Sequence, residues 1–162
     1  MRAVAGSAYL RSLGYVRRTS LPDGYFHAYS RGVAGLDAFP DDLDRMKMVT
    51  IIRLAERKLL IHVLACVVMT THFHIVVETT QEELSKALQW IKAVYARDFN
   101  KRHERFGAVF AERFSCRVID SPERLVDTCR YVRANPLAAG LCEAIEDWPW
   151  AFGSWGLDLA RF

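Results

Sequence analysis

The feature that most constrains the fold is an apolar, β-branched stretch at residues 67–78, which two histidines interrupt. In it, His72 and His74 alternate with large apolar residues. Side chains two positions apart in a β-strand point to the same face. We therefore predict a strand in which both imidazoles project one way, while Phe73 projects into whatever packs against the opposite face of the sheet.

Two imidazoles on one strand face have two interpretations. They lie about 7 Å apart along a strand, and neutral imidazole is a good ligand for divalent metal ions, so they can converge on one small cation. Alternatively, one is a half-buried histidine with a satisfied hydrogen bond and the other is a surface residue. The strand alone leaves both interpretations open.

The composition predicts one globular domain. The chain has 162 residues, of which 51% are hydrophobic and 25% charged, enough for a real core. It contains no apolar run long enough to span a bilayer and no secretory signal. Its four cysteines show no C-x-x-C spacing, which favours reduced thiols and a cytoplasmic protein. We expect a basic, flexible N-terminal arm at 1–22 and a single domain at 23–162.

The order of the predicted elements indicates the fold class. We predict a strand at 25–30, a helix from Asp41 or Asp42 to 58, strands at 59–68 and 72–78, a helix at 81–103, strand material at 108–110 and 113–119, and a helix at 121–134 that stops before Asn135 and Pro136. This is the order of an α+β, ferredoxin-like split βαβ sandwich with an antiparallel central sheet, plus an extra C-terminal helix. The first strand should lie beside the histidine strand.

The long helix at 81–103 carries two candidate features. Tyr95 lies on its apolar face, where it is either a core tyrosine with a hydrogen-bonded hydroxyl or a reactive phenol. A basic band surrounds it and continues beyond the helix, including Lys92, Arg97, Lys101, Arg102 and Arg113. Such a band either contacts a phosphate backbone, because neutralised phosphates release counterions, or is a solvated helix face.

Several motifs in order along the chain resemble one family. They are His72-Phe73-His74 after Met69-Thr70-Thr71, Tyr95-x-x-x-Phe99-Asn100, then Gly107, Phe110 and Arg113, and finally Tyr131-Val132-x-x-Asn135-Pro136-Leu137. In the first strand, Tyr25-Phe26-His27 fits the same pattern. Together they resemble the Y1 transposases among the HUH endonucleases, specifically the branch of REP-associated tyrosine transposases. The resemblance covers roughly residues 22–155.

The resemblance implies a metal-dependent single-stranded DNA endonuclease and strand transferase that forms a 5′-phosphotyrosine intermediate. It maps a Mg²⁺ or Mn²⁺ site onto His72 and His74, and the nucleophile onto Tyr95. The family usually adds a polar ligand from the tyrosine helix. Because Phe99 cannot bind a metal, Asn100 is the candidate for that third ligand.

The implied partner is single-stranded or hairpin DNA rather than a membrane, in a DNA-associated bacterial protein. Arg31 joins the basic band as a candidate phosphate contact. Tyr95 could serve the metal of its own subunit or that of a partner in a homodimer. The alternative function is a catalytically inactive, domesticated module that binds hairpin nucleic acid. The C-terminal tryptophans either stack on unpaired bases or pack the tail onto the domain.

Overall fold

The computed structural model describes residues 24–59 and 61–155, so the predicted N-terminal arm lies outside the described residues. The elements are β1 (Gly24–Arg31), α1 (Asp42–Lys58), β2 (Ile61–Val68), β3 (His72–Thr79), α2 (Gln81–Arg102), β4 (Ser115–Ile119), α3 (Pro122–Ala138), the 3-10 helix η2 (Ile145–Asp147) and β5 (Ala151–Phe152). In this part of the chain, no helix is long and apolar enough to cross a membrane.

The sheet has the strand order β4-β1-β3-β2-β5, and every neighbouring pair is antiparallel. The first strand therefore lies beside the histidine strand, as predicted, with Tyr29 opposite His74 and Arg31 opposite His72. The predicted α+β sandwich is confirmed, with the short β5 added at one edge. In the segment between α2 and β4, strand pairing is limited to a single bridge between Gly32 and Phe110. The strand expected at 108–110 therefore does not form.

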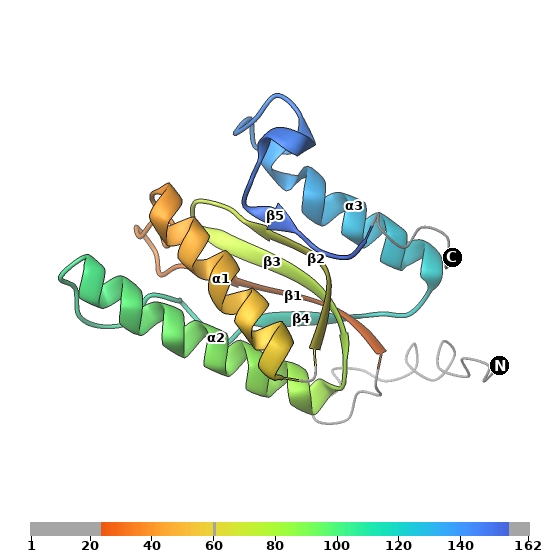
Figure 1. Cartoon of the computed structure of the whole chain (residues 1–162), viewed down its shortest axis with the longest axis horizontal. Helices are drawn as coiled ribbons and strands as arrows, with labels where there is room; N and C mark the ends of the chain where they lie inside the picture. The colour runs from red at the N-terminus through yellow and green to blue at the C-terminus, as the bar shows by residue number, and fades with distance from the viewer. Residues whose placement is uncertain (1–23, 60, 156–162) are drawn as a thin grey trace.

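The sheet separates two hydrophobic cores (Figure 1). On one face, Phe26, Phe73 and Ile75 pack in one cluster with buried residues of α1 and α2. On the other face, Val76 packs in a second cluster with buried residues of α3, including Val132. Because alternate residues of β1 and β3 point to opposite faces, the side chains of the histidine strand are divided between two chemically different surroundings.

The main helices begin at side-chain caps that the sequence makes recognisable. The side chains of Asp41, Thr80 and Ser121 accept hydrogen bonds from backbone N–H groups at the starts of α1, α2 and α3. Each bond satisfies a donor that has no partner inside the helix.

Helix α3 continues past the expected stop at Asn135 and ends at Ala138. Pro136 removes only one N–H donor from the helix, and the backbone of the last turn still forms its other hydrogen bonds. The N–H of Leu141 donates to the Pro136 oxygen at 2.9 Å, and Gly140 takes the left-handed conformation, with φ 68°, that commonly ends helices. Asn135 therefore belongs to the same helix as Tyr131, one turn further on.

The tail packs onto the domain. The indole N–H of Trp148 donates to the Val68 oxygen at 3.0 Å, and Trp155 packs with Trp148 against the core beneath α3. These contacts favour the packing interpretation of the C-terminal tryptophans over the base-stacking one.

The turn before β3 is fixed by a close backbone approach at Gly32. Its N–H donates to the Thr71 oxygen at 2.8 Å. A Cβ at this position would lie 2.9 Å from the Leu36 oxygen and 3.0 Å from the Ala38 Cβ. Only glycine lets the end of β1 sit this close to the turn that leads into His72.

We predict that Gly32→Ala lowers the free energy of unfolding by about 1–3 kcal/mol, because the added methyl overpacks this turn. Urea unfolding measures the effect. Gly24→Ala is the matched control on β1, since its Cβ would meet nothing within 4 Å. Equal stability of the two variants would contradict the steric account.

Candidate metal and nucleic-acid site

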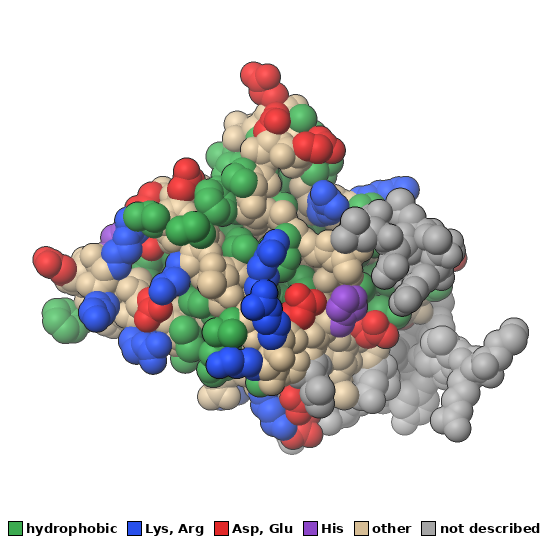
Figure 2. Space-filling view, in the orientation of Figure 1, with side chains coloured by type: hydrophobic (Ala, Val, Ile, Leu, Met, Phe, Trp, Pro, Cys, Tyr) green, Lys and Arg blue, Asp and Glu red, His purple; other side chains and the backbone are tan. Residues whose placement is uncertain are grey.

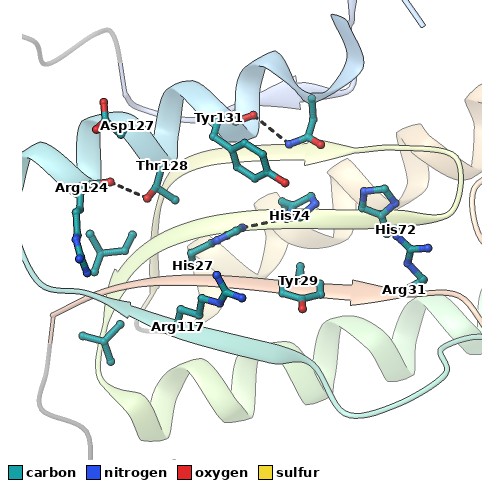
Figure 3. A pocket seen from close by; sticks show the side chains of 13 residues that line it. His27, Tyr29, Arg31, His72, His74, Arg117, Arg124, Asp127, Thr128 and Tyr131 are labelled. Carbon is teal, nitrogen blue, oxygen red and sulfur yellow. Dashed lines mark hydrogen bonds between the residues drawn. The ribbon is translucent and has the colours of Figure 1, made fainter. Parts of the chain in front are cut away.

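A cleft of about 750 Å³ lies between the sheet and α3 (Figure 3). Its lining comes from β1, β3, β4 and α3: His27, Tyr29, Arg31, His72, His74, Arg117, Val118, Ile119, Arg124, Asp127, Thr128, Tyr131 and Asn135. Three imidazoles, two phenols and three guanidinium groups thus face one open volume.

The two histidines of β3 both lie in this cleft. Their ring centroids are 5.0 Å apart, with the planes nearly perpendicular at 83°. His74 is only 7% exposed, and His72 is half-buried. Each Nδ1 already has a partner, Thr71 Oγ1 for His72 at 2.9 Å and His27 Nε2 for His74 at 2.9 Å. Both Nε2 atoms remain as the candidate metal-binding atoms.

Burial keeps these imidazoles neutral near pH 7. Desolvation, followed by the charges of His27, His72 and Arg31, lowers the pKa of His74 to about 3. Desolvation, with the nearby Arg117 charge, lowers the pKa of His27 to about 4. The pKa of His72 is also lowered, first by burial and then by Arg31. A neutral imidazole is the form that binds a metal ion.

The structure corrects the expected meeting of Tyr95 with the imidazoles. Tyr95 is completely buried in the core on the α1–α2 face of the sheet, in the cluster that contains Phe73. Its hydroxyl donates to the Ala38 oxygen at 2.5 Å. Burial, with Asp44 nearby, raises the pKa of its phenol above the ordinary value. Tyr95 is thus the core tyrosine that its position on an apolar helix face also allowed.

A different tyrosine, Tyr131, lies beside the histidine strand. Tyr131 on α3 is 56% exposed and lines the cleft. Its ring centroid lies 5.9 Å from that of His74 and 6.2 Å from that of His27. Figure 3 shows its side chain reaching from α3 toward His74. Tyr29 of β1 also lines the cleft, with its ring centroid 5.4 Å from that of His74, but it is half-buried, so Tyr131 is the exposed tyrosine of the cleft.

The predicted third metal ligand, Asn100, also lies away from the histidines. The amide nitrogen of Asn100 donates to the Gly107 oxygen at 2.8 Å, and Asn100 does not line the cleft. Asn135 does line it. Its amide nitrogen donates to the backbone carbonyl oxygen of Tyr131 at 3.0 Å. The amide oxygen of Asn135, the atom that a hard cation would bind, is not engaged by that bond.

The predicted basic residues separate into two groups. Arg31 lies in the cleft. The others extend along α2 and the segment after it, and several are engaged there: Lys92 with the Glu112 oxygen, Arg97 with Asp98, and Arg102 with Asp41 and Asp44. Figure 2 shows basic side chains over α1 and α2 interspersed with acidic and apolar ones. The cleft instead has Arg117 and Arg124 beside Arg31.

A second group of metal-binding residue types lies between the start of α1 and the end of α2. Ligand atoms of Asp41, Asp44 and His103 all lie within 4.8 Å of one another. Arg102, however, donates to both carboxylates at 2.7 Å, and His103 contacts Asp44 at 2.8 Å. One guanidinium already hydrogen-bonds both carboxylates, so this group is an ion-pair network that joins the two helices.

The structure thus places the predicted His72 and His74 together in the cleft, whereas Tyr95 and Asn100 lie elsewhere and Tyr131 and Asn135 line the cleft instead. The missed signal was the four-residue spacing of Tyr131 and Asn135, which puts two polar side chains on one helix face. The expected helix end before Asn135 concealed it. His27 also lines the cleft, where it contacts His74 from the neighbouring strand.

Sequence comparison identifies the family. Residues 37–135 match the family described as transposase IS200 like, also designated Y1. This match covers more than half of the chain and includes both strand histidines, Tyr131 and Asn135. The chain belongs to the IS200-like transposase family. The family expected from the sequence is confirmed, and the cleft of this IS200-like transposase combines residues inside the matched region with His27, Tyr29 and Arg31 from the strand before it.

Comparison with solved structures agrees on the fold. The structure of a REP-associated tyrosine transposase bound to a REP hairpin matches with a TM-score of 0.70 at 18% identity, covering 92% of this chain and 87% of that chain. A tRNA(His) guanylyltransferase from Saccharomyces cerevisiae matches with a TM-score of 0.53 at 11% identity, covering 83% and 67%. A search of curated protein sequences gives no match. The IS200-like family is generally metal-dependent.

The buried histidines predict a specific loss of stability in acid. The pKa of His74 is about 3 in the folded protein, well below the ordinary histidine value of 6.5 that applies to the unfolded chain. Between these two values the unfolded chain therefore binds more protons than the folded chain. The stabilisation is present above pH 6.5 and is lost as the pH falls. For metal-free protein we expect a loss of up to about 2 kcal/mol between pH 7 and pH 5.

Urea unfolding at both pH values measures this loss, with His74→Gln and His62→Gln as paired variants. His62 is exposed and lies outside the cleft, so His62→Gln should retain the wild-type pH dependence. His74→Gln should reduce it. The same pH dependence in both variants would contradict the assignment to His74.

Proposed function

We propose that this protein is a metal-dependent endonuclease and strand transferase acting on single-stranded DNA, with Tyr131 as the nucleophile. The observation that supports this most directly is the position of the exposed Tyr131, whose ring centroid lies 5.9 Å from that of His74. It joins a nucleophile and a pair of free imidazole nitrogens in one basic cleft. Catalytic sites are recognised by such convergence of roles rather than by position in the sequence.

Tyr131 needs help to react at neutral pH. A free tyrosine ionises near pH 10, so about one phenol in a thousand is ionised at pH 7, a penalty of roughly 4 kcal/mol. Arg31 and Arg117 line the same cleft and would favour both the phenolate and an anionic phosphodiester. Holding the phosphate in line with the phenolic oxygen converts the attack into an effectively intramolecular step.

The donor set of the cleft fits a divalent cation. His72 and His74 offer two neutral nitrogens, and Asn135 offers an amide oxygen from α3. Two imidazoles with an oxygen ligand suit Mn²⁺, and Mg²⁺ could occupy the same place with water completing its coordination. When bound, such an ion would polarise the phosphoryl oxygens of the scissile phosphate.

The covalent step balances without a nucleotide cofactor. The phenolic oxygen of Tyr131 forms a bond to phosphorus while the bond from phosphorus to the 3′-oxygen breaks. The phenol loses one proton and the departing 3′-oxygen gains one, giving a 5′-phosphotyrosine and a free 3′-hydroxyl. Because the phosphoester bond is conserved, a 3′-hydroxyl can reverse the attack and rejoin strands.

Hairpin DNA is the proposed substrate, and the REP-associated branch is the proposed place of this chain within its family. The basis is the shared fold with a transposase bound to a REP hairpin and the three arginines of the cleft, Arg31, Arg117 and Arg124. Guanidinium groups contact phosphates without reading sequence. The basic side chains of α2 and the following segment, Lys92, Arg97, Lys101, Arg102 and Arg113, are proposed only as outer contacts.

We predict that Tyr131→Phe abolishes the covalent protein–DNA adduct, because the attacking oxygen is removed, while hairpin binding changes less than about threefold. The measurement is a denaturing gel after incubation with labelled hairpin DNA and Mn²⁺, paired with a binding titration. Tyr95→Phe is the matched control and should still form the adduct. Loss of its bond to Ala38 should cost about 1 kcal/mol of stability.

An adduct formed by Tyr131→Phe would remove Tyr131 from this role. Hairpin binding by the wild-type protein without any adduct would instead support an inactive binding module. An adduct lost only in Tyr95→Phe would restore the tyrosine of α2 as the nucleophile.

Metal removal should abolish the adduct as well. After treatment with EDTA we expect no adduct, with recovery on addition of Mn²⁺ or Mg²⁺. His72→Gln should raise the Mn²⁺ concentration for half-maximal adduct formation by at least about tenfold. Asp41→Asn keeps a residue that caps helices equally well and should leave that concentration unchanged. The reverse pattern would move the metal to the group formed by Asp41, Asp44 and His103.

A further inference from the structure

Both strand histidines have the same hydrogen-bonding arrangement, although their partners come from different elements. The Nδ1 of His72 lies 2.9 Å from the hydroxyl oxygen of Thr71, the residue before it in the chain. The Nδ1 of His74 lies 2.9 Å from the Nε2 of His27, on the neighbouring strand β1. Among residues 24–59 and 61–155, neither Nε2 has a hydrogen-bond partner.

A neutral imidazole carries one N–H and one lone pair, and the hydrogen bond at one nitrogen decides which atom has which. If Nδ1–H donates to its partner, the lone pair lies on Nε2, where a metal ion can take it. If Nδ1 accepts instead, Nε2 carries the proton and cannot bind the ion. The partners of Nδ1 therefore control whether this strand can act as a ligand pair.

We propose that Thr71 and His27 are positioning residues that hold His72 and His74 in the Nδ1–H tautomer, with both Nε2 lone pairs directed to one cation. This inference rests on the proposed metal site. Thr71 accepts through its hydroxyl oxygen. His27 accepts through Nε2 and carries its own proton on Nδ1. Metal-binding histidines are commonly oriented by such a second hydrogen bond.

The surroundings make both partners rigid enough for this task. The Thr71 backbone oxygen accepts from Gly32, and this bond holds the turn while the hydroxyl faces His72. The ring of His27 stacks on that of His74, with centroids 5.1 Å apart and planes inclined by 25°. The ring of Tyr131 lies nearly perpendicular to that of His27, at 74° with centroids 6.2 Å apart. His27 thus packs against both His74 and the tyrosine of α3, and Figure 3 shows the three side chains in the cleft.

The test begins with the metal-free wild-type protein labelled with ¹⁵N. Long-range ¹H–¹⁵N correlation spectra report which ring nitrogen of each histidine carries the proton. We expect His72 and His74 as Nδ1–H tautomers, although the Nε2–H form dominates in free histidine. An Nε2–H tautomer at either position would overturn the proposal.

Variants then connect the tautomers to metal affinity, measured by Mn²⁺ titration without DNA. His27→Phe keeps a ring against His74 but removes the acceptor, and Thr71→Val keeps the shape but removes the hydroxyl. Each should weaken Mn²⁺ binding by roughly 10- to 100-fold. Thr71→Ser and His27→Gln restore an acceptor atom and should recover much of the affinity. His62→Phe, outside the cleft, should bind as the wild type does.

Unchanged affinity in both His27→Phe and Thr71→Val, or a wild-type protein that does not bind Mn²⁺, would overturn the inference. Circular dichroism of each variant separates lost positioning from lost folding, and the wild-type spectrum needs no variant. If Mn²⁺ binds with the expected tautomers but no DNA adduct forms, the proposed function fails while this inference stands.

Discussion

The alternation of side chains along β3 is the constraint on which the rest of this structure depends. Phe73 enters the core beneath α1 and α2, while His72 and His74 on either side of it enter the cleft beneath α3. A slip of one residue in register would exchange the two sets and bury the imidazoles among apolar groups. The pairing of β3 with both β1 and β2 along its length prevents that slip.

The same alternation decides which helix faces the histidines. Helix α2 packs on the face of Phe73, so its tyrosine becomes part of a core and its hydroxyl is used by Ala38. Helix α3 covers the opposite face, so Tyr131 and Asn135 meet the histidines. The acid-labile stability expected for His74 comes from this arrangement too, because an imidazole buried in its neutral form becomes charged on unfolding in acid.

The proposed function places two requirements on the cleft that usually conflict. Metal ligation needs neutral imidazoles, whereas binding a DNA backbone needs positive charge. Burial contributes most to lowering the pKa values of His27 and His74, and the charges of Arg117 and Arg31, respectively, lower them further. Under the proposed function, the same arginines would contact the phosphate and add to the effect of burial that keeps the histidines neutral.

The sequence by itself determined the element order, the central place of the histidine strand and the family, because periodicity and motif spacing are local properties of the chain. Its motifs indicated Tyr95 and Asn100, although Tyr131 and Asn135 form a similar local pattern. Only the tertiary structure shows that Tyr131, and not Tyr95, lies in the cleft of the histidines, since this depends on which face of the sheet each helix covers. The partnership of His27 with His74 likewise required strand pairing across 47 residues, which no local pattern specifies.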